Sequence, residues 1–245
     1  MHERDVLLEG MVNVRDLGGF RTKTGQTTRY NVFLRGDAPY RISDSARHRV
    51  VEQGLHTVID MRYAHEVAQR PNRFAGYPDV DFHHIPLYVE TTYLGMIRQF
   101  RDLGGWYCTI LDQGGTPIRN ILGVLSRAEG VCLLQCYLGK DRTGILSALL
   151  LNVVGVSEAD IIADYLQSQE NLRVIHEEIQ SVRPFFVTKP QFENIISAKR
   201  EYITALLAHL SQKYSDAEGY MRAIGVLEED IAILRQKLIV PECRL

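Results

Sequence analysis

The sequence predicts an α/β fold in which a central, mostly parallel sheet is flanked by helices and the C-terminal half of the chain is helical. Up to residue 156, short β-branched or apolar runs alternate with segments of helical character, an order typical of parallel sheets. The run VCLLQ at 131–135 is apolar without alternation, as expected of a strand covered on both faces. The 245 residues suit one domain, 1–245, which we divide into an α/β core over 1–156 and a helical extension over 157–245.

The N-terminal elements follow from local signals. Ser43 is a suitable N-cap and Gly54 a suitable end for a helix between them, and the run HTVIDM that follows is rich in β-branched residues. We therefore expect, in order, extended segments and turns over the first 40 residues, a helix over 44–53, and strands over 56–61 and 82–87.

Most of the remaining elements are predicted to be helices. Pro117 near the start and Gly130 just past the end predict a helix over 117–129. The hexamer RDLGGW at 101–106 predicts that the preceding helix ends on its two glycines. The other expected helices cover 93–103, 143–154, 158–168, about 170–181, about 191–213, 216–224 and 227–238.

Composition excludes several classes of protein. The 28 basic residues nearly balance 30 acidic ones, so the net charge of -2 gives no general attraction to nucleic acid or to an anionic membrane. Four cysteines are too few for a disulfide framework, which favours a reducing, cytoplasmic location, with signal-independent export left open. The charged N-terminus lacks the apolar core of a signal peptide, and the longest apolar run, 145–156, is too short to span a bilayer. We expect no cofactor and no integral membrane association.

The segment CYLGKDR joins strand 131–135 to helix 143–154 and contains Cys136 and Arg142. Backbone N–H groups in such a loop and at the start of the following helix have no partner within the helix. They can therefore bind a phosphate together with the planar fork of Arg142. The same donors stabilise a thiolate, which makes Cys136 a nucleophile. Neither a Walker A loop nor a metal site fits the spacing of the residues in this region.

The decamer QCYLGKDRTG at 135–144 resembles the signature loop of the cysteine-dependent protein tyrosine phosphatases, HCxxGxxR[ST]G. Its Gly-Lys-Asp-Arg form is similar to the atypical bacterial tyrosine and lipid phosphatases. Further landmarks of that group are resembled, in order, by NVRDLGG, FLRGDAP, VIDMRYAHE, GVSEADIIADYLQS and the closing YSDAEGYMRAIGVLEEDIAILRQKL, so the resemblance covers nearly the whole chain. It implies a single phosphatase domain with helices on both sides of the sheet. Gln135 stands where the family has His, and no WPD motif is recognisable.

The chemistry that this loop predicts is covalent. Cys136 attacks phosphorus, and water hydrolyses the resulting phosphocysteine. In line with the resemblance, Asp141 is the first candidate to protonate the leaving oxygen, with Asp60 and Asp112 as alternatives. Thr143 either hydrogen-bonds the departing thiolate or only begins the helix. The residues expected to bind phosphate are Tyr137, Leu138, Gly139, Lys140, Asp141, Arg142 and Thr143.

Three functions remain open from the sequence. The leading one is a phosphatase that acts on phosphotyrosine. Phosphoserine, phosphothreonine and phosphoinositides are further candidate substrates, with inorganic phosphate as product. Lys140 adds a positive charge at a position resembling that in phosphoinositide phosphatases, so we expect release of phosphate from inositol lipids as well. Gln135 motivates the alternative of a catalytically weak or silent phosphate-binding pseudophosphatase. The third is arsenate reduction, which also begins with a Cys-x5-Arg loop but needs further thiols, and only Cys132 is near in sequence.

Charged residues also occur within the N-terminal motifs. Our preferred interpretation is a buried ion-pair network that ties these motifs to the sheet, and direct catalysis is the alternative. The residues concerned are Arg15, Asp16, Asp37, Arg62 and Glu66.

Overall fold

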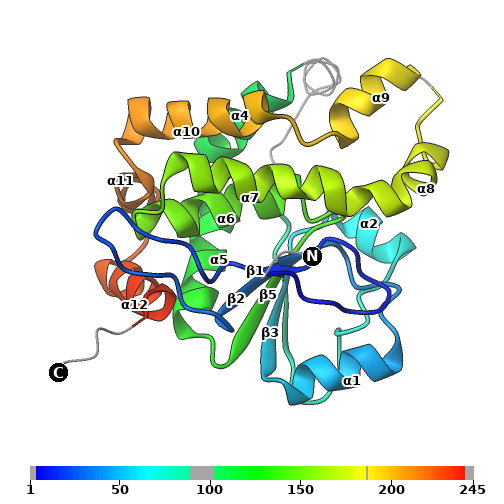
Figure 1. Ribbon diagram of the computed structural model, residues 1–245, viewed down its shortest axis with the longest axis horizontal. Helices are drawn as coiled ribbons and strands as arrows, with labels where there is room; N and C mark the ends of the chain where they lie inside the picture. The colour runs from blue at the N-terminus through cyan, green and yellow to red at the C-terminus, as the bar shows by residue number, and fades with distance from the viewer. Residues whose placement is uncertain (1–3, 89–101, 186, 241–245) are drawn as a thin grey trace.

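The computed structural model describes residues 4–88, 102–185 and 187–240 (Figure 1). Its sheet has the strand order β1-β2-β5-β3-β4, in which β1 is antiparallel to β2 and all other neighbours are parallel. The mostly parallel sheet is therefore confirmed, with β5 at its centre. The strands are β1 (Arg15–Asp16), β2 (Phe33–Gly36), β3 (Leu55–Asp60), β4 (Asp81–His84) and β5 (Val131–Gln135).

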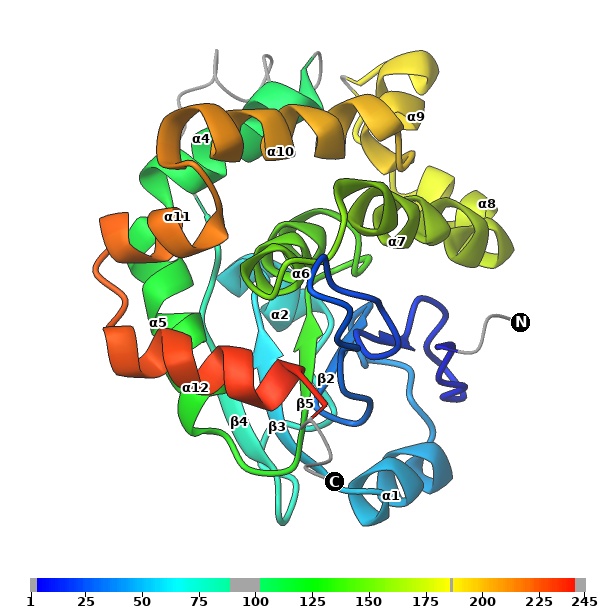
Figure 2. The ribbon, with the colours of Figure 1, turned by 60° about the vertical axis from the view of Figure 1, so that its left-hand side comes forward.

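Helices flank this sheet and make up the chain after β5 (Figures 1 and 2). Before β5 lie α1 (Asp44–Glu52), α2 (Ala64–Gln69), α4 (Leu103–Gln113) and α5 (Gly115–Arg127). After it lie α6 (Asp141–Val153), α7 (Glu158–Asn171), the 3-10 turn η1 (Leu172–Ile175), α8 (His176–Ser181), α9 (Lys189–Ile196), α10 (Arg200–Tyr214), α11 (Ala217–Ala223) and α12 (Glu228–Leu238). No helix within the described ranges is both long enough and apolar enough to cross a bilayer.

The central strand β5 is buried on both faces, which explains its lack of alternation. Val131 and Leu133 pack in a smaller apolar cluster that includes residues of α1. Cys132 and Leu134 face the larger cluster, which is built with α4, α5, α6 and the helices from α10 to α12. Because successive side chains of a strand point to opposite faces, each face of β5 needs an apolar residue at every second position.

The long helix expected over 191–213 is wrong in one respect, because the chain forms two helices there, α9 and α10. Ser197 adopts an extended conformation and ends α9, and α10 begins three residues later. Apolar spacing continues across the break, so the periodicity could not reveal it. The break leaves backbone carbonyl oxygens without helical partners. The ammonium group of Lys140, in the loop after β5, donates to two of them.

The hexamer at 101–106 is a second correction, because it starts α4 and does not end a helix. Asp102 is the N-cap of α4 and its side chain accepts a hydrogen bond from Gly105 N at 2.8 Å. The capping aspartate thus outweighs the two glycines that suggested an end. The helix expected over 93–103 lies almost entirely outside the described residues.

Candidate active site

The loop between β5 and α6 is tight and packs on the end of β2. Cys136 follows β5 directly, and α6 begins at Asp141. Gly139 has a φ of 68°, and a Cβ atom there would lie 2.4 Å from backbone atoms of Gly36. Only glycine therefore fits this position, because both the backbone conformation and the available space exclude a side chain.

The carbonyl groups of this loop are held by the N-terminal segment. The bonds run from Ala38 N to Tyr137 O at 3.1 Å, from Asn13 Nδ2 to Leu138 O at 2.8 Å, and from the Arg35 guanidinium to Gly139 O at 2.8 Å. In a trans peptide the N–H of the next residue points opposite to the carbonyl. Fixing these carbonyls therefore turns the following N–H groups toward the other side of the loop, where an anion can bind them.

A cluster of three arginines around one carboxylate lies behind the loop. Asp164 of α7 pairs with Arg4 at 2.9 Å, with Arg15 at 3.0 Å and with Arg35. Burial alone would raise the pKa of Asp164, but the arginines hold it far below its usual range. Burial, together with repulsion from Arg35, lowers the pKa of Arg15 to about 10. The cluster carries three positive charges and one negative charge. Arg35 connects it to the loop, because its guanidinium also donates to Gly139 O.

The predicted N-terminal ion-pair network is only partly right. Arg15 does join a buried network, but its partner is Asp164, which the sequence did not single out. Asp16 and Asp37 accept hydrogen bonds mainly from backbone N–H groups of neighbouring turns. The other two, Arg62 and Glu66, form separate pairs with Asp60 and with Arg142.

Cys136 lines a cavity of about 510 Å³. Its walls come from the start and end of α2, from the first turns of α4, from the loop after β5, and from α8 and α9 with the residues between them. Much of the lining is aromatic or apolar, including Tyr63, Trp106 and Phe192. Segments far apart in sequence thus meet around one thiol that is almost fully buried.

Arg142 is held at the edge of this cavity by Glu66. Its two terminal nitrogens donate to the Glu66 carboxylate at 2.6 and 2.9 Å, and its guanidinium lies 4.8 Å from the centre of the Tyr63 ring. Burial would raise the pKa of Glu66, but the hydrogen bonds and charge of Arg142 outweigh it and lower that pKa. Glu66 thus forms an ion pair, as expected, but with a residue of the loop, and its place as the third residue of a short helix gives no signal for this contact.

Asp141 also lines the cavity, and a buried tyrosine holds its carboxylate. The hydroxyl of Tyr107 donates to Asp141 Oδ1 and lies 2.8 Å from the hydroxyl of Tyr165. Burial, with the nearby Asp141 charge, raises the pKa of Tyr107 well above its ordinary value. Tyr107 therefore stays protonated and remains a hydrogen-bond donor to Asp141.

The two alternative acids lie outside the cavity. Asp60 is fully buried and accepts hydrogen bonds from Arg62 and Asn72. Asp112 is on α4, where His209 and Lys213 of α10 contact its carboxylate at 2.8 and 2.9 Å. Against the effect of burial, these hydrogen bonds lower the pKa of both carboxyl groups. Neither group is placed to give a proton to a substrate bound near Cys136.

Lys140 does not present its charge to the cavity, in contrast to the expectation of a role in lipid binding. Its side chain is fully buried, and Nζ donates to the carbonyl oxygens of Ile195 and Ser197, the latter at 2.9 Å. It also lies 3.2 Å from Asp141 Oδ1. Burial lowers the pKa of Lys140, although Asp141 opposes that effect. Lys140 thus ties the loop to the break between α9 and α10.

Two buried polar side chains beside the loop lack partners within the part of the chain that the structure describes. Neither amide atom of Gln135 makes a hydrogen bond, although the side chain is fully buried and the residue is in register with Asp60 and Gly36. The hydroxyl of Thr143 is likewise buried and unpaired. Thr143 does not line the cavity, and its expected contact with the sulfur stays a prediction.

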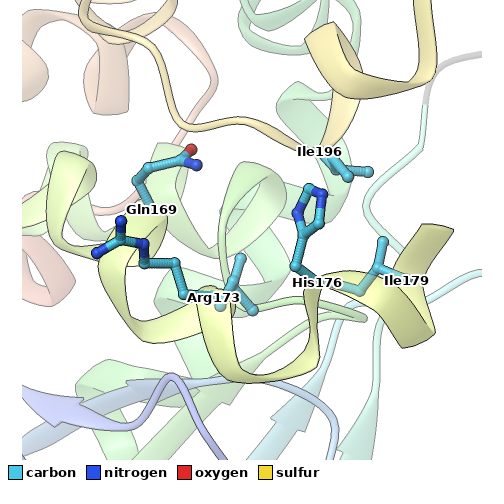
Figure 3. A pocket seen from close by; sticks show the side chains of 6 residues that line it. Gln169, Arg173, His176, Ile179 and Ile196 are labelled. Atoms are coloured by element: carbon cyan, nitrogen blue, oxygen red, sulfur yellow. The ribbon is translucent and has the colours of Figure 1, made fainter. Parts of the chain in front are cut away.

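The helices α8 and α9 form the outer wall of the cavity and pack on each other. Ile179 and Ile196 belong to a small apolar cluster with Leu172, and they also line a small hollow beside His176 (Figure 3). The carboxylate of Glu193 lies 3.5 Å from His176 Nε2 and accepts a hydrogen bond from the Gln180 amide. The described part of this wall is thus held by one small apolar cluster and by polar contacts of Glu193.

Comparison with known proteins decides the family. The model of the tyrosine phosphatase family matches residues 6–240. The chain belongs to this family. A tyrosine-protein phosphatase of Nostoc commune is 30% identical over 221 residues, which cover 85% of this chain and 74% of that protein. The triple specificity protein phosphatase PtpB of Mycobacterium tuberculosis is 25% identical over 278 residues, with 95% of this chain and 98% of that protein covered.

A third relative agrees with this assignment. A putative tyrosine-protein phosphatase of Cupriavidus necator is 26% identical over 243 residues, which cover 94% of this chain and 87% of that protein. The predicted membership in the cysteine-dependent phosphatases is thereby confirmed, and the chain is a protein-tyrosine phosphatase. Within the described ranges, no group of three or more His, Cys, Asp and Glu side chains could hold a metal ion.

Proposed function

We propose that the chain hydrolyses phosphotyrosine monoesters through a phosphocysteine on Cys136. The observation that carries this proposal is the meeting of Cys136 and the Glu66-bound Arg142 in one cavity. Arg142 offers two parallel N–H donors that fit two phosphate oxygens, and the loop N–H groups add further donors. The thiolate attacks phosphorus, the tyrosine oxygen leaves, and water then releases inorganic phosphate.

The leaving oxygen takes its proton from Asp141 in this proposal. Asp141 lines the cavity, and Tyr107 and Lys140 fix its carboxylate from the buried side. The same carboxyl group then takes a proton from the water that attacks the phosphocysteine. Asp60 and Asp112 are left out because both are engaged elsewhere.

The cavity walls support an aromatic substrate. Tyr63, Trp106 and Phe192 offer flat apolar surface, on which a phenyl ring packs better than a polar sugar does. Phosphoserine, phosphothreonine and phosphoinositide esters remain further substrates to test. The charge on Lys140 no longer argues for the lipid, because its ammonium binds carbonyl oxygens of this chain.

We place the reaction in the cytoplasm, where a reducing environment keeps the thiol of Cys136 reduced.

One experiment tests the reaction and its nucleophile. The purified chain should hydrolyse p-nitrophenyl phosphate and phosphotyrosine peptides, and Cys136→Ser should lower the rate at least a thousandfold because a hydroxyl is a far weaker nucleophile. Cys132→Ser, four residues earlier on β5, is the matched control and should keep the rate. A wild-type protein that binds vanadate but turns nothing over would favour the pseudophosphatase. Activity that requires arsenate and added thioredoxin would favour reduction.

A further inference from the structure

Two arginines lie together on one tyrosine, outside the groups that the proposed reaction uses, and one of them, Arg70, lines the cavity. Arg41 and Arg70 each donate to the hydroxyl of Tyr40 at 2.5 Å, and their guanidinium carbons lie 4.8 and 4.6 Å from the centre of the Tyr40 ring. Arg70 also lies 5.2 Å from the centre of the Tyr137 ring, and Tyr137 directly follows Cys136. Arg70 itself lines the cavity. Arg70 thus lies in the cavity wall and contacts the residue that follows the predicted nucleophile, and Tyr40 joins it to Arg41.

The negative charge that faces this pair comes from the outer wall of the cavity. Glu178 of α8 forms an ion pair with Arg41, lies 3.9 Å from Arg70 and lies 3.5 Å from the Tyr40 hydroxyl. Among the described residues, Glu178 is the only carboxylate that pairs with these two guanidinium groups, so the three side chains together carry one excess positive charge. Each guanidinium has five N–H donors, so donors also outnumber the acceptors supplied by Glu178 and Tyr40.

All three charged side chains can be reached from solution. The exposed fractions of the Arg41, Arg70 and Glu178 side chains are 40%, 26% and 38%. Ion pairs with this exposure contribute little to stability, because water solvates both partners when they separate. A phosphate carries up to two negative charges and three acceptor oxygens, so it can replace the single carboxylate of Glu178.

We infer that Arg41 and Arg70 form a second anion site, which binds a second phosphate on the phosphotyrosine peptide being hydrolysed. Glu178 occupies the site when no such substrate is bound, and the second phosphate displaces it. The aromatic walls favour a peptide over an inositol phosphate, since the ring of phosphotyrosine must pack there while the neighbouring phosphate reaches Arg70. This inference rests on the proposed phosphatase activity.

The test compares two synthetic peptides that share one phosphotyrosine and differ at the adjacent position, which is alanine in one and phosphothreonine in the other. We expect the wild-type chain to release phosphate from the phosphotyrosine of the doubly phosphorylated peptide with a kcat/KM about tenfold higher. Arg41→Gln should reduce that ratio to near one and leave the hydrolysis of p-nitrophenyl phosphate within twofold of wild type. Arg47→Gln is the matched control, because Arg47 also lies over a tyrosine ring, 4.3 Å from the centre of Tyr77, and pairs with Asp44.

A second variant tests the role of Glu178. Glu178→Gln should raise kcat/KM for the doubly phosphorylated peptide severalfold and leave the singly phosphorylated one unchanged, whereas Glu177→Gln, exposed on the same helix, should change neither. Equal kcat/KM values for the two peptides in the wild-type chain would overturn the inference, and so would a preference found only among soluble inositol phosphates. Loss of all turnover, p-nitrophenyl phosphate included, would instead refute the proposed function.

Discussion

The carboxylate of Glu66 binds both terminal nitrogens of Arg142, at 2.6 and 2.9 Å, beside the thiol of Cys136. A third contact, from Arg142 to the carbonyl oxygen of Met61 at 3.3 Å, fixes the plane of the guanidinium. Glu66 thereby sets the orientation of the group proposed to bind phosphate, and in the proposed reaction it acts only through Arg142. It is a positioning residue, and its contribution to stability can be measured apart from turnover.

Glu66→Gln should destabilise the fold by roughly 2 kcal/mol at pH 7, because it leaves the nearly buried charge of Arg142 without its partner. The pKa of Glu66 is lowered in the folded state, so its stabilisation is complete above the pKa of the unfolded chain and is lost as pH falls through the folded value. The difference between variant and wild type should therefore shrink below about pH 4. Urea unfolding at several pH values measures it. A difference that does not depend on pH would contradict the ion pair, and Glu201→Gln, with a carboxylate 69% exposed, is the control.

The fold and the loop could be predicted because their signals are local. The apolar run of β5, the glycine of the loop and the arginine six residues after Cys136 lie within one short stretch of sequence. Asp164 could not be found in this way, because it lies one helix beyond the loop. Its ion pairs with Arg15 and Arg35 form only when α7 packs against the N-terminal segment.

Lys140 illustrates a second limit of sequence reasoning. Its position in the loop indicates a charge near phosphate, but the direction of a side chain depends on what packs against it. The carbonyl oxygens that bind Lys140 come from residues 55 and 57 positions later, at a helix break that the apolar periodicity conceals. The partner of Glu66 could not be predicted for the same reason, since Arg142 is 76 residues away.

Asn13→Ala tests whether the N-terminal segment positions the loop. The variant loses the hydrogen bond to the carbonyl oxygen of Leu138. The peptide that follows Leu138 can then rotate, and its N–H no longer points to the side of the loop where we expect the phosphate of the substrate to bind. We expect kcat/KM for p-nitrophenyl phosphate to fall ten- to a hundredfold, roughly, with weaker inhibition by inorganic phosphate. Asn171→Ala removes a different bond to Asn13, at 3.2 Å, and should have a much smaller effect. Similar losses in both variants would mean that Asn13 acts only through general stability.

Asp141→Asn tests the proposed general acid through the leaving group. Phenol is a poor leaving group and needs a proton, whereas p-nitrophenolate leaves without one. We therefore expect the variant to lose about a hundredfold in kcat/KM on phenyl phosphate and much less on p-nitrophenyl phosphate. The ratio kcat/KM is compared because it excludes hydrolysis of the phosphocysteine, a step in which the same carboxylate acts for both substrates. Asp112→Asn should change neither value. Equal losses of kcat/KM on the two substrates in Asp141→Asn would remove the role as acid and leave Asp141 as a residue that fixes the loop or activates water.

Asp37→Asn should change the pH dependence of stability. Burial raises the pKa of Asp37 to about 6, although the backbone N–H groups of Val12 and Asn13 oppose it. The folded chain therefore binds more protons than the unfolded chain between about pH 4 and 6, and the free energy of unfolding falls as pH rises through that window. The variant cannot ionise, so it should gain about 3 kcal/mol on wild type between pH 4 and pH 7. Chemical unfolding at both pH values measures this gain, and a gain equal to that of the exposed control Asp44→Asn would contradict it.

Gln135→Met should stabilise the protein, because the amide of Gln135 is fully buried and makes no hydrogen bond to any described residue. An unpaired buried polar group costs about 1–3 kcal/mol, and methionine has nearly the same shape without that group, so we expect Tm to rise by roughly 2–12 °C. Gln167→Met is the matched control. Gln167 is also buried, but its amide nitrogen donates to Asp5 at 2.6 Å and its amide oxygen accepts from Arg4 at 3.3 Å. The same exchange at Gln167 should therefore lower Tm. A Tm that falls in Gln135→Met as well would contradict the prediction, because it would mean that the buried amide stabilises the fold.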